Sequence, residues 1–590
     1  MKTFCTDKIR NIAVAGHNGS GKTALTEALL YKAGACERLG RTADGTSVCD
    51  FDAEEIKRGI SINTALASVE YNDYKFNILD TPGLFDFAAE MCEGIKAADT
   101  VVITVSAKSG VKVGTKKAYD EAVNEGKSKM FAVTKIDDKD ANFYNVLTEL
   151  KTVFGPTVCP VVVPVLKNSE IIAYVNLIEM KAYKYDADGT AVEIPIPDGN
   201  ISEKMDYRLD GLIAEISEAV AETSEERMEK FFDGGKFTQK ELIEGIHDGM
   251  NRGIITPVVC TSAVNFAGID MIMKEFELLL PSPAEVYPTE AYTPAKEVVE
   301  IKCDSSAPLT AFVFKTVADP FVGKMSFIRV MSGTLSANSE VINATSDSPE
   351  KIGKLYTLCG KKQTEVQSAQ AGDIVVASKI NANTSDTLCT TAKLIEFGKI
   401  EFPKPCYSMA VKAKSQGDEA KISAGIQRIL EEDPTLRYTQ DENTKEQILS
   451  GLGEQHLDVA DRHLLDGQGV GLQHHQVGLL ADRDRAAGRL LVLLPGGPQG
   501  DRPQGLHRRQ ALVGPQRIAA AGHPVHRAPH HVHGHRRHDR GVGMQAEADA
   551  VLQGLGRGAD EGRPIRSQGL GPVPVAPVVG VLGEEARKDA

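Results

Sequence analysis

The sequence has no tryptophan, and its 10 cysteines show none of the CxxC spacings that mark zinc or redox sites. In a chain of 590 residues this excludes a small disulfide-rich secreted scaffold. No apolar run reaches the roughly 18 to 20 residues needed to cross a bilayer. The first residues, MKTFCTDKIR, contain no apolar signal core. We therefore expect a cytoplasmic protein with reduced thiols and no membrane partner.

The last part of the chain lacks whole classes of residue. Residues 461–590 contain no Phe, Tyr, Cys, Thr or Asn, and they hold 1 Lys against 16 Arg. Residues 1–460 hold 40 Lys and 10 Arg. The segment 461–590 also contains 11 of the 14 His and 22 of the 54 Gly, without a sustained period of 2 or 3.6. With so little to anchor a core, this low-complexity tail is predicted to be unfolded.

Three interpretations of this tail are open. It can be a His-rich metal-binding segment, since imidazole ligates Zn, Cu and Ni. It can be an Arg-rich segment that binds RNA. We favour a third interpretation, translation of a GC-rich gene in the wrong reading frame. That explains why Lys, Phe, Tyr and Asn disappear together while Arg, Gly, His and Pro increase. No functional residue is assigned beyond residue 460.

Short apolar strands alternate with helical segments before residue 264. Helical spacing occurs at 22–33 and 86–99. The strand candidates are 9–16, 75–80, 100–107, 129–137 and 256–263. This alternation predicts a mainly parallel, doubly wound α/β sheet, in which functional groups collect at the carboxyl ends of the strands.

Composition divides the chain into an α/β domain and three further parts. The α/β domain carries an insertion at about 158–255, which begins with strands and continues as an acidic helix at 202–232. Four prolines in 281–295 mark a linker. Short β-rich runs then predict a β-barrel, and a strand–helix–strand pattern predicts a partial α+β (ferredoxin-like) domain, which would lack the last strand of the third domain in the family that the chain is shown below to resemble. The predicted parts are 1–282, 300–395, 403–460 and the tail 461–590.

The segment GHNGSGKT at 16–23 fits GxxxxGK[ST] between a strand and a helix, the context of a phosphate-binding loop. Its glycines let backbone N–H groups face phosphate oxygens, and the helix N-terminus adds a favourable dipole. Lys22 is expected to reach the β- and γ-phosphates, and Thr23 to ligate Mg²⁺. The predicted nucleotide-binding residues here are Gly16, His17, Asn18, Gly19, Ser20, Gly21, Lys22 and Thr23.

A second motif, DTPG at 80–83, directly follows a strand. Asp80 is predicted to hold Mg²⁺ directly or through water, and the Gly83 N–H to reach a γ-phosphate. The alternative is an ordinary Asp-Thr-Pro-Gly turn. The residues assigned to the site are Asp80, Thr81, Pro82, Gly83 and Leu84.

Two further segments follow strands and point to guanine. Asp137 can accept hydrogen bonds from guanine N1–H and its exocyclic amine, which adenine does not offer. The Lys135 stem can pack over the purine ring, and 261–263 can offer a backbone N–H to the guanine O6. Taken alone, each segment also fits a common turn after a strand. The residues assigned are Thr134, Lys135, Ile136, Asp137, Thr261, Ser262 and Ala263.

The order of these four motifs along one domain resembles the translational GTPases, and elongation factor G most closely. The resemblance covers roughly 8–460 and includes RGISI at 58–62, FELLLPSP at 276–283 and SGLGEQHLDV at 450–459. It implies a P-loop GTPase domain that binds GTP or GDP with Mg²⁺, and a monomer whose partner is the ribosome, both RNA and proteins. It also implies ribosome-dependent GTP hydrolysis coupled to translocation of tRNA and mRNA. The implied catalytic residues are Lys22, Ser61 and Gly83, and the implied metal ligands are Thr23, Ser61 and Asp80.

The sequence departs from the family pattern at several positions. Leu84 stands where the family usually has the His that positions the hydrolytic water, and losing one such group commonly costs on the order of 10²- to 10³-fold in rate. Ser61 replaces a Thr, Thr134 replaces an Asn, and Gly19 replaces a common Asp. The family's fourth and fifth domains are not recognisable after residue 460. Two alternatives therefore stay open: a GTP-binding ribosome-associated switch with little hydrolysis, and a ribosome-protection GTPase of the tetracycline-resistance type.

Removing the tail is predicted to leave GTP affinity unchanged, because every nucleotide motif lies before residue 264. Limited proteolysis of the full chain should leave a resistant fragment that ends near the third domain. Protection of 523–538 by Zn²⁺ or Ni²⁺ would favour the metal-binding interpretation. A protease-resistant tail that unfolds cooperatively without metal would contradict the prediction of an unfolded segment.

Overall fold

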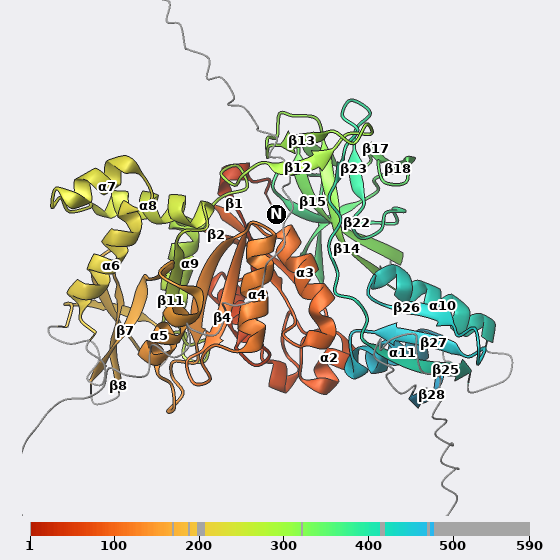
Figure 1. The fold of residues 1–590 in the computed structure, drawn as a ribbon, viewed down its shortest axis with the longest axis horizontal. Coiled ribbons are helices and arrows are strands. Elements are labelled where there is room, and N and C mark those ends of the chain that lie inside the picture. Colours follow the sequence, from red (N-terminus) through yellow and green to blue (C-terminus); the bar gives the residue numbers. More distant parts are fainter. Residues whose placement is uncertain are drawn as a thin grey trace, which may run out of the picture. The chain divides into compact units, whose positions relative to one another are not determined.

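The computed structural model describes residues 2–167, 170–186, 189–197, 207–319, 323–413, 419–468 and 472–476 (Figure 1). The prediction that the tail is unfolded therefore falls, from residue 477 on, outside the described residues. Among the residues described, no helix has both the length and the apolar character needed to span a bilayer.

The first domain is built on the predicted parallel sheet. Its strands lie in the order β2-β3-β1-β4-β5-β11-β6, and each neighbouring pair is parallel except β2 and β3. All eight residues of β1 are buried, because helices cover both faces of the sheet. The strands are β1 (Ile9–Gly16), β2 (Ala65–Tyr71), β3 (Tyr74–Asp80), β4 (Thr100–Ser106), β5 (Ser128–Thr134), β6 (Val158–Pro160) and β11 (Thr256–Cys260).

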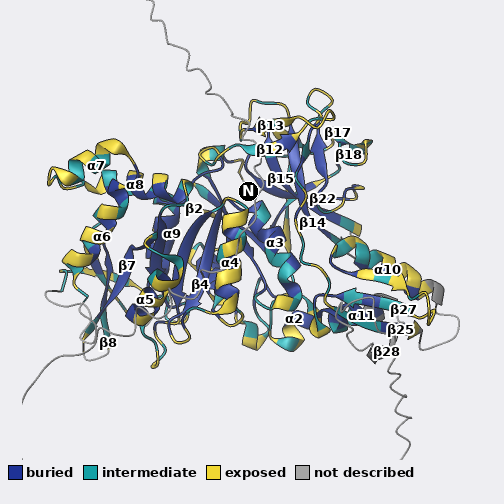
Figure 2. Ribbon diagram, in the orientation of Figure 1, coloured by how far each residue is buried: buried dark blue, intermediate teal, exposed yellow. Residues whose placement is uncertain are grey.

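The helices of this domain pack on the sheet in two groups. One group contains α1 and α9, which contact each other, and another contains α3 and α4. Figure 2 shows buried strands between helices whose outer sides are exposed. The doubly wound α/β fold is thus confirmed. The helices are α1 (Lys22–Lys32), α2 (Ala53–Arg58), α3 (Ala88–Ala97), α4 (Val113–Asn124), α5 (Phe143–Phe154) and α9 (Ile269–Leu278).

The insertion contains a separate antiparallel sheet in the order β10-β9-β8-β7, followed by three helices. The single acidic helix predicted at 202–232 is wrong over its described part. The helix ends at Ala221 and a new one begins at Glu225, because the Ser224 side chain accepts a hydrogen bond from the Arg227 N–H and caps the second helix. The elements are β7 (Val162–Lys167), β8 (Glu170–Asn176), β9 (Lys181–Tyr185), β10 (Ala191–Ile194), α6 (Leu209–Ala221), α7 (Glu225–Phe232) and α8 (Gln239–Asn251).

The β-barrel predicted after the linker is present. Its main strands follow the order β18-β17-β23-β14-β15-β22-β19, around a core that includes Val313, Ile328 and Leu355. Strand β19 also pairs with β2 at Cys359 and Ala67, which joins the barrel to the edge of the first sheet. The barrel strands are β14 (Thr310–Asp319), β15 (Gly323–Ser332), β17 (Glu340–Asn343), β18 (Ser348–Lys351), β19 (Leu355–Cys359), β20 (Lys362–Val366), β22 (Ile374–Ser378) and β23 (Thr387–Cys389). Shorter strands are β12 (Thr289–Tyr292), β13 (Val298–Ile301), β16 (Thr334–Ser336), β21 (Ser368–Gln370) and β24 (Glu396–Phe397).

The third domain extends further than composition predicts. Its sheet has the order β26-β27-β25-β28, so the last strand, which we expected to be missing, is present and pairs with β25. The boundary predicted at residue 460 falls inside helix α11. Leu457, Ala460 and Leu464 are all buried in the same core, because helical apolar spacing continues across that point. The elements are β25 (Tyr407–Ala413), α10 (Glu419–Glu432), β26 (Arg437–Gln440), β27 (Gln447–Gly451), α11 (Glu454–Gln468) and β28 (Leu472–Gln476). A truncation that keeps this domain must end after residue 476.

Buried ion pairs connect the first domain to the barrel. Lys75 Nζ on β3 lies 2.6 Å from Asp373 Oδ1, and the two side chains are 2% and 9% exposed. Asn77 Nδ2 donates to the same carboxylate oxygen at 3.1 Å. Arg329 on β15 pairs with Asp99 at the start of β4, and both side chains are buried. Both side chains of each pair are shielded from water. The charge of each is therefore stabilised mainly by its partner.

Replacing Asp373 by Ala is expected to destabilise the protein by roughly 3 to 5 kcal/mol, because it leaves the Lys75 ammonium group buried without a partner. Urea unfolding of the full chain measures this loss. The matched control is Asp73→Ala, which removes a carboxylate from an exposed pair with Lys2 and should change the urea midpoint little. Equal midpoints for the two variants would contradict the importance of the buried pair.

Candidate functional site

The phosphate loop connects the last residue of β1 to the first residue of α1. Gly16, Gly19 and Gly21 have φ values of 135°, 72° and 95°, in the left-handed region that favours glycine. A Cβ on Gly16 would also crowd the Thr104 carbonyl oxygen on β4. The Thr104 hydroxyl lies 2.6 Å from that of Ser20. The loop is therefore shaped by its glycines and held by the neighbouring strand.

Lys22 turns its ammonium group back over this loop. Nζ donates to the carbonyl oxygens of Gly16 at 3.3 Å and His17 at 3.1 Å, and the residue is 5% exposed. Burial lowers the pKa of Lys22 and raises the pKa of Asp80. The nearby Asp50 carboxylate acts against the lowering of the Lys22 pKa and adds to the rise of the Asp80 pKa. A phosphate group at Lys22 and a cation at Asp80 would each stabilise the charged form.

The three predicted metal ligands come together beside Lys22. Thr23 Oγ1 lies 3.1 Å from Ser61 Oγ, and the Thr23 side chain is close enough to Asp80 to act against the rise in the pKa of that carboxyl group. Asp80 is 1% exposed at the end of β3, and its Oδ2 atom has no hydrogen-bond partner among the described residues. Two hydroxyls and a carboxylate thus face one point at the carboxyl end of the sheet.

The DTPG segment closes the other side of the site. The Thr81 hydroxyl donates to the Val14 carbonyl oxygen at 2.9 Å, which holds the segment beside β1. Gly83 lies so close to Lys22 Nζ and to the Asn18 backbone that a Cβ there would overlap both. Only glycine fits at this position without a shift of the phosphate loop.

The TKID segment at the end of β5 is tied directly to the phosphate loop. The Thr134 hydroxyl donates to the Ser20 carbonyl oxygen at 2.5 Å. Lys135 has φ of 57°, and its Nζ donates to the Gly19 carbonyl oxygen at 2.8 Å. The Lys135 stem therefore spans the space between the two loops, and Asp137 beyond it is exposed.

The TSA segment lies beside TKID because β11 pairs with β5, with Cys260 opposite Val133. The Thr261 hydroxyl donates to the Ala267 carbonyl oxygen at 2.9 Å, and the Ser262 N–H donates to the same oxygen at 2.9 Å. Ser262 is fully buried. The segment is thus folded into a tight loop at the same edge of the sheet.

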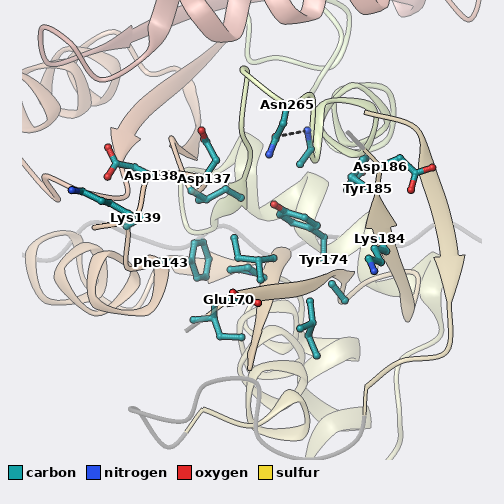
Figure 3. Close-up of a pocket in the computed structure, with 18 residues that line it drawn as sticks. Asp137, Asp138, Lys139, Phe143, Glu170, Tyr174, Lys184, Tyr185, Asp186 and Asn265 are labelled. Carbon is teal, nitrogen blue, oxygen red and sulfur yellow. Dashed lines mark hydrogen bonds between the residues drawn. The ribbon is translucent and has the colours of Figure 1, made fainter. Parts of the chain in front are cut away.

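A cavity of about 390 Å³ lies on the outer side of the TKID loop (Figure 3). Asp137 and Ile136 line it together with residues of the insertion strands, among them Tyr174 and Tyr185. Neither Lys135 nor any residue of the phosphate loop is part of its lining. The cavity therefore borders the candidate nucleotide site and is distinct from the phosphate-binding part.

The residues at this sheet edge fit a nucleotide and a divalent cation. The buried polar atoms that lack a hydrogen-bond partner within the described part of the chain include three in the motifs of this edge: His17 Nδ1, Asp80 Oδ2 and Ser262 Oγ. Such atoms cost free energy unless a ligand or water satisfies them. No group of three or more His, Cys, Asp or Glu able to hold a metal occurs in the described ranges. A cation here would bind two hydroxyls, one carboxylate and ligand oxygens, a set that suits Mg²⁺.

Comparisons with known proteins agree with this geometry. Residues 7–282 match the family described as the elongation factor Tu GTP binding domain, residues 308–391 match elongation factor G domain 2, and residues 402–476 match elongation factor G domain III. A crystal structure of a protein from Thermus thermophilus is 31% identical, with a TM-score of 0.71 over 80% of this chain and 67% of that chain. The chain belongs to the translational GTPases of the elongation factor G type.

Leu84, the departure from this family's DTPGH motif, has an apolar environment. It packs with Ile60 against a buried cluster of Ile62, Phe87 and Val459. The side chain therefore joins the segments 58–62 and 80–87 to helix α11 of the third domain. It has no polar atom with which to orient water.

Sequence patterns missed three buried carboxylates that shape this elongation-factor-G-type site. Asp50 is 2% exposed and accepts a hydrogen bond from the Thr42 hydroxyl at 2.6 Å. Glu27 on α1 is 1% exposed and accepts the N–H groups of residues 48 and 49. Burial raises the pKa of Glu55 to about 7, although three backbone N–H groups donate to it. No sequence motif marks these residues.

Replacing Thr134 by Ala is expected to weaken GDP binding about fivefold or more, because the Ser20 carbonyl oxygen loses its buried donor at a cost of roughly 1 to 3 kcal/mol. Thr134→Ser keeps the hydroxyl and is the matched control, expected to bind nearly as the unmodified chain does. Titration with a fluorescent GDP analogue measures both. Equal GDP affinities for the two variants would show that the hydrogen bond between Thr134 and Ser20 does not contribute to nucleotide binding.

Proposed function

We propose that this chain binds GTP and GDP with Mg²⁺ and hydrolyses GTP on the ribosome, in support of tRNA and mRNA translocation. The observation that carries the proposal is the meeting of four strand-end segments at one sheet edge. Segments 16–23 and 80–83 surround the buried Lys22 ammonium group, 134–137 is bound to the phosphate loop through Thr134, and 261–263 lies beside it because β11 pairs with β5. A monomer in the cytoplasm, with ribosomal RNA and proteins as partners, is part of the same proposal.

Each group has a defined task at the phosphate end of this site. Lys22 would supply the countercharge for the β- and γ-phosphates, and Gly83, which lies against Lys22, would offer its N–H to the γ-phosphate. Thr23, Ser61 and Asp80 would hold Mg²⁺. When bound, the cation neutralises charge that develops on the phosphate oxygens.

Guanine selection is assigned to the TKID and TSA segments. Asp137 accepts the two donors of the guanine edge, and adenine leaves that carboxylate unpaired. The Lys135 stem covers the ring, while its ammonium group stays bound to the Gly19 carbonyl oxygen. Ala263 follows the folded Ser262 turn and would offer its N–H to the guanine O6.

A second candidate is a GTP-binding ribosome-associated switch that hydrolyses GTP very slowly. The packing of Leu84 against Ile60 and the Val459 cluster favours it, since no polar group occupies the water-orienting position. Ribosomal RNA can still stimulate turnover by ordering the neighbouring segments, because phosphoryl-transfer catalysis is mostly positioning and electrostatics.

Steady-state GTP turnover with and without ribosomes separates the two candidates. The translocation proposal expects slow intrinsic turnover that ribosomes stimulate, and loss of both tight GTP binding and stimulation in Lys22→Ala. Lys32→Ala removes the same charge from the exposed end of α1 and should behave as the unmodified chain. Tight GTP binding without stimulation would favour the switch, and normal GTP binding by Lys22→Ala would overturn the phosphate-loop assignment.

A further inference from the structure

Helix α11 of the third domain contacts both segments that flank the candidate Mg²⁺ site (Figure 1). Asp458 Oδ2 lies 2.5 Å from Arg58 Nη2 at the end of α2. The Gln455 N–H donates to Asp86 Oδ2 at 3.0 Å, just after the DTPG motif. Between these polar contacts, Val459 packs with the apolar cluster that contains Ile62.

Residues 59–63, which follow α2, fold around the buried side chain of Glu55. The Gly59 N–H donates to the Glu55 carbonyl oxygen at 2.8 Å. The N–H groups of Ile62 and Asn63 donate to Glu55 Oε1 at 3.0 and 2.9 Å. Ser61 lies within this segment, and its hydroxyl is the one found 3.1 Å from Thr23. Its position therefore depends on how residues 58–63 are held.

Two side chains fix residues 58–63. Glu55 binds the backbone at Ile62 and Asn63, and Arg58 is bound by acidic side chains at the start of the segment. Arg58 Nε donates to Glu54 Oε2 of the same helix at 2.9 Å, which fixes the side chain against α2. Asp458 supplies a contact to Arg58 from outside the first domain, and Arg462 adds a longer contact, 3.7 Å, to Glu54. The guanidinium group thus lies between an acid of α2 and an acid of the third domain.

We infer that Asp458 is a positioning residue for the Ser61 hydroxyl, so that the third domain completes the Mg²⁺·GTP site through Arg58. Asp458 does not touch the nucleotide site itself. It acts by fixing Arg58 at the start of residues 58–63, while Glu55 fixes Ile62 and Asn63 at the end of the same segment. This inference rests on the proposed function, in which Ser61 ligates Mg²⁺ when GTP is bound.

The test compares Asp458→Asn with the unmodified full chain. Loss of the charge should raise the Mg²⁺ concentration needed to retain a fluorescent GTP analogue roughly two- to fivefold, the scale of a partly exposed ion pair. GDP affinity should stay unchanged, since the Ser61 contact belongs to the GTP state. Without any nucleotide, amide hydrogen exchange at Ile62 and Asn63 should become faster.

Two controls separate positioning from a general loss of stability. Glu454→Gln removes one negative charge from an exposed residue of the same helix and should leave all three readouts unchanged. In an Arg58→Gln background, Asp458→Asn should have a much smaller effect, because the contact that remains to be lost is the longer one between Asp458 Oδ2 and Arg462 Nε, 3.6 Å.

The outcomes of the proposed function and of this inference are distinguishable. An unmodified chain that binds no GTP would overturn the proposed function, and the exchange rates at Ile62 and Asn63 would still test the positioning. If Asp458→Asn and Glu454→Gln match in Mg²⁺ dependence and in exchange, Asp458 has no role in placing Ser61. Equal loss of GTP and GDP binding would likewise overturn the inference, because it would indicate unfolding of the site.

Discussion

Lys22 places an ammonium group where water scarcely reaches, and the two groups that accept its hydrogen bonds are backbone carbonyls. Burying such a charge is unfavourable unless the surrounding structure supplies compensation. Asp80 and Asp50 lie close enough to oppose the loss of its charge. Neighbouring segments hold the loop in the shape that makes this burial possible, since Thr134 and Lys135 bind the carbonyl oxygens of Ser20 and Gly19. The phosphate loop is therefore held in place by contacts within the chain itself.

Much of this arrangement was predictable from the sequence, because it follows local rules. The strands that end at Gly16, Asp80 and Thr134 are short, mostly apolar segments, and each leads into a motif with a known geometry. The roles of Glu27 and Asp50 were not predictable, because they depend on which loops fold back over α1. The third-domain boundary was misplaced for a different reason. Composition changes near residue 460, whereas the packing of Leu464 depends only on helical spacing, which the change does not interrupt.

Two departures from the family pattern have different physical consequences. Thr134 has lost an amide, yet its hydroxyl still reaches the phosphate loop, so the tether between the two loops is retained. Leu84 has lost a polar group, and its side chain has joined an apolar cluster that includes Val459 of the third domain. The first change leaves a hydroxyl that binds the phosphate loop. The second removes a polar group from the water-orienting position and adds an apolar contact between the first and third domains.

The ion pair between Lys75 and Asp373 has a consequence for how the chain is made. The partners are 298 residues apart in the sequence. At about 5 to 20 residues per second, synthesis brings Asp373 out roughly 15 to 60 s after Lys75. During that interval the nascent first domain carries a lysine at its edge with no carboxylate from the barrel to meet it. The contact between β3 and the barrel therefore forms only after the barrel strands have been synthesised and have docked.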